Sequence, residues 1–150
     1  MRIPQLSLTI ANQPGHLIAP CKLLADAGIN ILTLTLADTQ RFGILRLILK
    51  EPDEARAILE RGGFIVKTTD VVAVMIADQP GGLRAVLDVI EQAEVNIEYM
   101  YAFTARTGGK AVMVFRLDDA DKGIAALREN GINVLSSANL YELAGHGTPV

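Results

Sequence analysis

Two stretches of this chain repeat one another, and the repeat constrains the fold more than any other feature of the sequence. Residues 10–15 read Ile-Ala-Asn-Gln-Pro-Gly and residues 76–81 read Ile-Ala-Asp-Gln-Pro-Gly, an offset of 66 positions. The same offset relates residues 27–31, Ala-Gly-Ile-Asn-Ile, to residues 93–97, Ala-Glu-Val-Asn-Ile. Self-similarity over this distance indicates two copies of one small structural unit in a chain of 150 residues.

Within each copy, the spacing of apolar residues alternates between the period of strands and the period of helices. We expect strands in the first copy at residues 6–11, 29–37, 44–50 and 64–69, with helices over 17–28 and from Pro52 to Gly62. We expect strands in the second copy at residues 71–77, 96–105, 111–117 and 132–140, with helices over 82–93 and 120–130. Both copies therefore have the order strand, helix, strand, strand, helix, strand.

This βαββαβ order predicts an α+β fold in which each copy forms an antiparallel four-stranded sheet with both helices on one face, the ferredoxin-like arrangement. We expect one domain over residues 1–69, a second over residues 70–144 and a tail over residues 145–150. The sequence between the copies contains no stretch rich in Gly, Pro or Ser. The copies are therefore expected either to dock side by side or to exchange a strand.

Composition argues against several classes of function. With 14 Lys and Arg against 17 Asp and Glu, the chain has no excess of positive charge for nucleic-acid binding. No export signal and no apolar run of about 20 residues is visible, so we expect a cytoplasmic protein with no membrane partner. Cys21 cannot form an internal disulfide, and His16 and His146 do not form a metal-binding cluster. No metal, redox role or cofactor is expected.

The repeated polar motif is the strongest candidate for a binding site. Residues 12–15 and 78–81 each connect the first strand of a copy to its first helix. A glycine there lets a ligand approach the backbone, and the start of a helix attracts an anion such as a carboxylate. Asn12 or Asp78 could then hold an ammonium group. Alternatively, the motif is a turn whose Asn or Asp side chain caps the helix.

A second polar residue repeats with the motif, because Asn30 lies 18 residues after Asn12 and Asn96 lies 18 residues after Asp78. Together, the D/N-x-P-G-x-L motif, the A-x-x-N-I entry to the second strand and the βαββαβ order resemble the ACT domain family. The runs at residues 37–39 and 42–46 are similar to those of small stand-alone tandem-ACT, amino-acid-binding proteins. The resemblance covers nearly the whole chain twice.

This resemblance implies a pair of domains, joined edge to edge in one sheet, that bind a free amino acid at the seam. The residues that it implies as ligand contacts are Asn12, Gln13, Pro14, Gly15, His16, Leu17, Asn30, Asp78, Gln79, Pro80, Gly81, Gly82, Leu83 and Asn96. The copies differ at His16 against Gly82, and at Asn12 against Asp78. The two sites are therefore not expected to be equivalent, and His16 could instead be a solvated residue at the start of a helix.

Apolar residues occur on both faces of the predicted strands. Leu45, Leu47 and Leu49 alternate to one face, and Ile44 and Ile48 to the other. Helices cover only one face of a ferredoxin-like sheet, so we expect the other face to pack against a second chain in a homodimer.

Three functions remain open. The first is a non-catalytic sensor or regulatory protein that binds an amino acid. The second is a small enzyme, but no nucleophile, base and orienting residue can be placed together, and the loop lacks the Arg used by acylphosphatases of similar fold. The third is an interaction module without a ligand.

Overall fold

The computed structural model describes residues 1–145, apart from the side chains of residues 104–107, and it divides into two compact units. The N-terminal unit is Pro4–Thr69. The C-terminal unit consists of Met1–Ile3 together with the chain from Asp70 onwards. No helix in the described part of the chain is long and apolar enough to cross a membrane.

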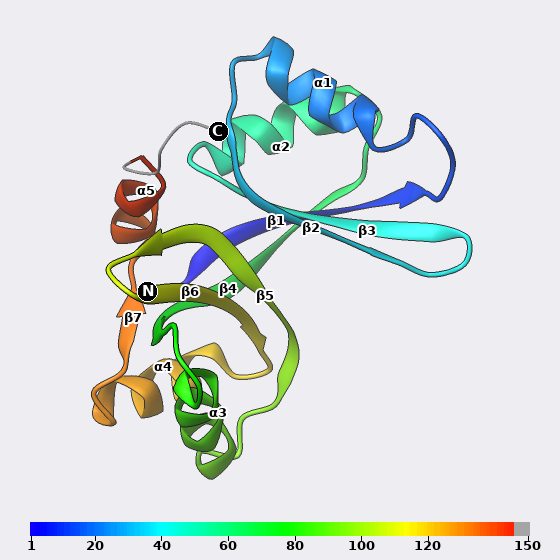
Figure 1. Cartoon of the computed structure of the whole chain (residues 1–150). Coiled ribbons are helices and arrows are strands. Elements are labelled where there is room, and N and C mark those ends of the chain that lie inside the picture. Colours follow the sequence, from blue (N-terminus) through cyan, green and yellow to red (C-terminus); the bar gives the residue numbers. More distant parts are fainter. Residues whose placement is uncertain (146–150) are drawn as a thin grey trace. The chain divides into compact units, whose positions relative to one another are not determined.

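The N-terminal unit has the predicted βαββαβ order (Figure 1). The strands lie in the order β2-β3-β1-β4, and β3 pairs antiparallel with both β1 and β2. Helices α1 and α2 contact each other and cover one face of this sheet (Figure 1). The elements are β1 (Ile3–Ala11), α1 (Ile18–Asp26), β2 (Ile31–Asp38), β3 (Phe42–Leu49), α2 (Pro52–Arg61) and β4 (Val66–Ala77).

The C-terminal unit repeats the order, beginning with the second half of β4. Its strands lie in the order β5-β6-β4-β7, and all three neighbouring pairs are antiparallel. The predicted α+β fold with two βαββαβ units is therefore confirmed. The remaining elements are α3 (Gly82–Gln92), β5 (Ile97–Thr107), β6 (Lys110–Leu117), α4 (Ala120–Glu129), β7 (Asn133–Leu135) and α5 (Ser137–Gly145).

The boundary between the units falls inside strand β4. The sequence predicts separate strands at residues 64–69 and 71–77, but one strand, Val66–Ala77, replaces both. Thr69 and Asp70, where one unit ends and the other begins, are thus consecutive residues of a strand. The boundary thus falls within a strand and not within a separate loop.

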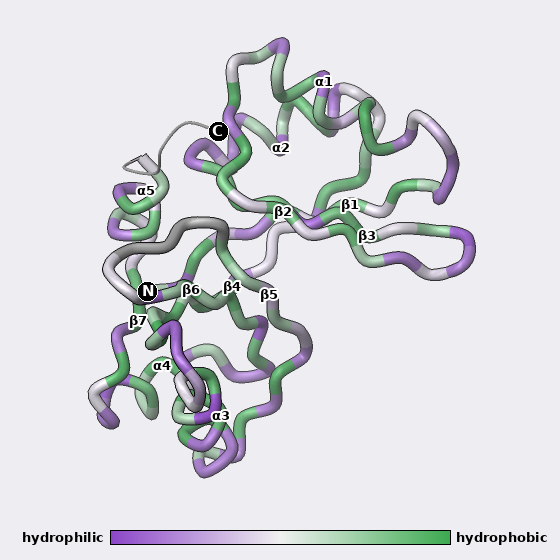
Figure 2. The backbone as a smooth tube through the Cα atoms, in the orientation of Figure 1, coloured by the Kyte–Doolittle hydropathy of each residue, from purple (hydrophilic) through white to green (hydrophobic). Residues whose placement is uncertain are grey.

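Alternating strand residues form a separate core in each unit. On β3, the fully buried Leu45, Leu47 and Leu49 pack with Leu24 of α1 and Leu59 of α2. Burying one such side chain stabilises the fold by about 1.5–3 kcal/mol. In the C-terminal unit the equivalent core includes Val72, Val74, Val86, Ile90, Phe115 and Leu127. By contrast, the tip of the β2–β3 hairpin is hydrophilic (Figure 2).

The prediction for residues 132–140 was wrong in part, because the last strand is short and a helix follows it. Strand β7 ends at Leu135, and α5 starts at Ser137. The amide of Asn139 donates to Ser136 Oγ at 3.1 Å, and Ser136 Oγ donates to Asn139 Oδ1 at 2.6 Å. A serine that caps amides in this way starts a helix. The helix extends to Gly145, and residues 146–150 of the predicted tail lie outside the described residues.

The first helices of the two units start at different positions. Helix α3 starts at Gly82, whereas α1 starts at Ile18, two residues later than the repeat offset would place it. Pro20 is therefore the third residue of α1. The first turn of a helix has no internal acceptors for its amides, so a proline there removes no hydrogen bond. The later start accommodates Pro20, which would otherwise lie deeper in the helix.

Candidate ligand site

The repeated motif folds into the same kind of turn in both units. Gly15 and Gly81 both adopt left-handed backbone angles, with φ of 84° and 86°. The amide of Asn12 donates to the carbonyl of Arg41 at 3.1 Å, and the amide of Asp78 donates to the carbonyl of Gly109 at 2.9 Å. A non-glycine residue with this φ is strained, so the Pro-Gly pair in both copies is explained by the turn.

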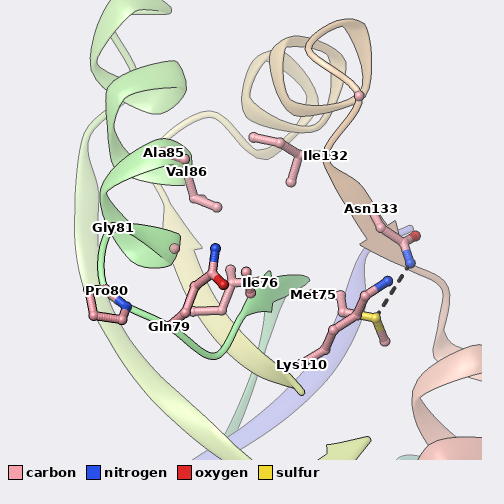
Figure 3. A pocket seen from close by; sticks show the side chains of 13 residues that line it. Met75, Ile76, Gln79, Pro80, Gly81, Ala85, Val86, Lys110, Ile132 and Asn133 are labelled. Atoms are coloured by element: carbon pink, nitrogen blue, oxygen red, sulfur yellow. Dashed lines mark hydrogen bonds between the residues drawn. The ribbon is translucent and has the colours of Figure 1, made fainter. Parts of the chain in front are cut away.

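In the C-terminal unit this turn forms one wall of a pocket of about 430 Å³ (Figure 3). The start of α3, the end of β4, the start of β6 and the turn before β7 surround it. Val86 and Ile132 point into the pocket from different elements, and Gln79 points into it from the turn (Figure 3). The lining residues are Met75, Ile76, Ala77, Gln79, Pro80, Gly81, Gly82, Ala85, Val86, Lys110, Gly131, Ile132 and Asn133.

The polar groups of this pocket suit a carboxylate. Of the described residues that line it, Lys110 alone is charged. The start of α3 adds the partial positive charge of a helix N-terminus. The Asn133 amide donates weakly to the Met75 sulfur, at 3.9 Å. A cation and two amide side chains beside apolar surface can hold a small acid that also has an apolar part.

Gly82 brings α3 against the strand that precedes the turn. A Cβ atom at this position would collide with the carbonyl oxygen of Ala77. Any side chain there would push the first turn of α3 away from β4. The counterpart of Gly82 in the N-terminal unit is His16, which is exposed and precedes its helix instead of starting it.

The corresponding pocket of the N-terminal unit is much smaller, at about 70 Å³. This volume is well below the roughly 300–1,000 Å³ of ligand pockets in proteins. The residues that line it are Ile10, Ala11, Asn12, Gln13, Leu17, Leu36, Asp38 and Gly43. The two copies of the motif therefore have unequal surroundings, as the sequence differences predict.

The structure places the two repeated Asn residues far from the turns. Ala77, next to Asp78, pairs with Lys110 at one end of β6, whereas Ile97, next to Asn96, pairs with Leu117 at the other. These ends are roughly 23 Å apart at 3.3 Å per residue. The backbone amide of Asn96 instead donates to Asp118 Oδ1 at 2.9 Å, and the backbone amide of Asp118 donates to the Asn96 carbonyl at 3.1 Å.

Asn30 lies just before β2 in the same way, at the end of the sheet opposite Asn12. No single unit therefore brings its Asn and its turn together. In the C-terminal unit, Gln79, Pro80, Gly81 and Gly82 line the large pocket, whereas Asp78, Leu83 and Asn96 do not. In the N-terminal unit, Asn12, Gln13 and Leu17 line the small pocket, whereas Pro14, Gly15, His16 and Asn30 do not.

Neither Asn12 nor Asp78 occupies the capping position of its helix. The N-cap residues are Leu17 for α1 and Gly81 for α3, and neither makes a side-chain capping bond.

Sequence reasoning missed the pocket residues that come from other segments, notably Lys110, Ile132 and Asn133. Lys110 follows the Gly108-Gly109 pair, and a hairpin there brings the first residue of β6 beside the end of β4. That glycine pair was the available signal. Within the described residues, no three His, Cys, Asp or Glu side chains are grouped to hold a metal ion.

Comparison with known proteins identifies the family. The family model described as an ACT domain pair matches residues 1–144. No curated protein sequence matches the chain. A crystal structure of a protein from Bacteroides thetaiotaomicron is 37% identical, with a TM-score of 0.88 over 95% of this chain and 97% of that one.

Two further structures share the fold at lower identity. The ligand-free regulatory subunit of aspartate kinase from Thermus thermophilus is 20% identical, with a TM-score of 0.64 over 85% of this chain and 90% of that one. The regulatory subunit from Thermus flavus is also 20% identical, with a TM-score of 0.59 over 84% and 90%. The match over residues 1–144 shows that this chain belongs to the ACT domain family, as an ACT domain pair.

Proposed function

We propose that this protein is a non-catalytic regulatory protein that senses a free amino acid. The observation that supports this most is the pocket of about 430 Å³ at the repeated turn of the C-terminal unit. Ligand pockets in proteins range over about 300–1,000 Å³, and they combine apolar walls with a few placed polar groups. The family supports the regulatory role, since its members with aspartate kinase names are regulatory subunits.

An amino acid matches the polar groups of the pocket. Its carboxylate would face Lys110 and the start of α3, where positive charge is concentrated. Its ammonium group would face amide oxygens such as that of Gln79. Asn12, Asp78, Asn30 and Asn96 stay predicted ligand residues on the strength of the family motif.

A thermal-shift screen of the twenty common amino acids tests the proposal. A ligand present at about 100 times its dissociation constant, and bound only by the folded state, adds roughly 2.7 kcal/mol to the free energy of unfolding. At least one amino acid should raise the melting temperature, and the matching amine without a carboxylate should not. If no amino acid changes the melting temperature, the protein is not an amino-acid sensor.

We also propose that the chain forms a homodimer. The β2–β3 hairpin exposes apolar side chains on both of its faces, and large exposed apolar side chains often mark an interaction surface. Those of this hairpin are Leu34, Leu36, Phe42 and Ile44, which are 46%, 44%, 52% and 36% exposed.

A further inference from the structure

We infer that each chain binds one ligand, in the C-terminal unit alone, and that this ligand is an α-amino acid with an uncharged aliphatic side chain. The inference rests on the proposed function and adds to it the number of sites and the chemical class of the ligand. It follows from the unequal pockets of the two units and from the side chains that line the larger one.

The volumes of the two pockets indicate which unit binds the amino acid. The pocket of the C-terminal unit, about 430 Å³, falls within the roughly 300–1,000 Å³ of ligand pockets, whereas that of the N-terminal unit, about 70 Å³, is well below this range. The same motif lies beside both pockets. A sequence match to the motif therefore does not by itself make a binding site.

Three sequence differences between the copies fit the difference in pocket volume. Gly82, which holds α3 against β4, corresponds to His16. Val86, on the pocket wall, corresponds to Pro20, and α1 starts later than α3. The pairing of Ala77 with Lys110 corresponds to that of Ala11 with Phe42, so an aromatic ring replaces the cation.

The charges point the same way. The large pocket has Lys110 on its wall, and the small one has Asp38. A carboxylate beside Lys110 makes a charge-assisted contact, whereas a carboxylate beside Asp38 is repelled. The start of α3 adds further positive potential to the large pocket.

The apolar walls of the larger pocket favour a ligand with an aliphatic side chain. Val86 is 3% exposed, and together with Ile76, Ile132 and Met75 it lines the pocket with hydrocarbon and a thioether. An aliphatic side chain would gain about 25 cal/mol for each Å² of apolar surface removed from water, a general magnitude for hydrophobic burial. A charged side chain would have to lose its hydration among these residues.

The polar residues leave no partner for a basic side chain. Among the described lining residues none is acidic, and Gln79 and Asn133 offer neutral amide oxygens. These oxygens can accept hydrogen bonds from the α-ammonium group of an amino acid whose carboxylate faces Lys110. A lysine or arginine ligand would find no carboxylate in the wall.

Titration calorimetry on the full chain tests both parts, with leucine, isoleucine, valine and methionine as probes and aspartate and lysine as comparisons. We expect one site per chain, and at least about tenfold weaker binding of aspartate and lysine. Isopentylamine, which is leucine without its carboxylate, should not bind detectably.

The variants Lys110→Met and Lys110→Arg test the carboxylate contact, and Arg41→Met is the matched control. Arg41 is an exposed cation of the corresponding hairpin in the N-terminal unit, beside the counterpart of Lys110. Lys110→Met should weaken leucine binding about tenfold or more, Lys110→Arg, which keeps the charge, should weaken it less, and Arg41→Met should leave it within about twofold.

The outcomes separate this inference from the proposed function. Two sites per chain, preferred binding of aspartate or lysine, or equal loss in Lys110→Met and Arg41→Met would overturn the inference while amino-acid sensing stands. Failure of every amino acid to bind would overturn the proposed function itself, and this inference with it.

Discussion

Gly82 meets the carbonyl oxygen of Ala77 so closely that a methyl group at position 82 would collide with it. This contact fixes the start of α3 against the end of β4, and both elements supply walls of the larger pocket. Because backbone rather than a flexible side chain blocks the space, local side-chain movements cannot relieve the collision.

Gly82→Ala should therefore reduce the free energy of unfolding by about 1–3 kcal/mol, the usual range for overpacking. The variant should also weaken amino-acid binding, because α3 must move. Urea unfolding and calorimetry measure the two effects. His16→Ala is the matched control, and it should change stability by less than about 0.5 kcal/mol. Equal losses in the two variants would contradict the special role of Gly82.

Asp78→Ala should weaken amino-acid binding more than Asn12→Ala, by about tenfold or more. The family resemblance implies that both side chains lie near an ammonium group, and a carboxylate attracts that group more strongly than a neutral amide does. Asp78 does not itself line the pocket, but it adjoins Gln79, which does. The larger pocket also lies in the unit of Asp78. Calorimetry on the two variants decides the matter. Unchanged affinity in Asp78→Ala would remove this residue from the site.

Glu94→Gly should stabilise the protein by about 1 kcal/mol, since a left-handed conformation costs a non-glycine residue about 1–2 kcal/mol and glycine is more flexible when unfolded. Glu94 has φ of 55°, and its counterpart Gly28 has φ of 72°. Both residues end the first helix of their unit. Gly28→Ala should destabilise by a similar amount. Thermal unfolding of both variants is the measurement, and a destabilised Glu94→Gly would contradict the argument.

Arg2, near the N-terminus, should make the free energy of unfolding vary with pH in the acid range. Its Nε and Nη2 donate to both Asp121 oxygens at 3.1 and 2.6 Å, and its Nη1 donates to Asp70 at 3.1 Å. These contacts lower the pKa of Asp121 below its usual value. A depressed carboxyl pKa adds stability above the unfolded pKa, near 4, and that stability is lost as the pH falls through the folded pKa.

Arg2→Gln should therefore lower the melting temperature at pH 7 and leave it nearly unchanged at pH 2. Because all three side chains are exposed, the difference at pH 7 should shrink in 1 M salt. A difference of equal size at both pH values would show that Arg2 acts through packing and not through its charge.

Light scattering should give a mass well above the 16.1 kDa of one chain. Replacing both Phe42 and Ile44 by lysine should shift the protein towards the monomer, because the charges cannot be buried in an apolar interface. Ile65→Lys is the control, since Ile65 is 84% exposed elsewhere in the chain. If Ile65→Lys dissociates the protein to the same extent, the hairpin is not the interface.

The fold could be predicted because its signals are local. Pro52 and the acids after it begin α2 as expected, and the polar residues after β2 form the hairpin tip. The helix after β7 depends on the contact between Ser136 and Asn139. That signal is only four residues long, and it directly follows the residues of β7, so the sequence favours a longer strand there.

The candidate site could be predicted only in part. The turn at Gly81 is visible as a repeat, whereas Lys110, Ile132 and Asn133 join it through strand register. The repeat does not show that Asn96 lies at the opposite end of its sheet from the turn, where it exchanges hydrogen bonds with Asp118.

Strand β4 has a consequence for how the chain is degraded. Proteases cut where a segment can unfold locally, and domain boundaries usually offer such a segment. Here the boundary residues Thr69 and Asp70, and Lys67 near them, belong to strand β4 and not to a loop. We therefore expect trypsin to cut slowly at Lys67, so that brief digestion should not release two separate copies.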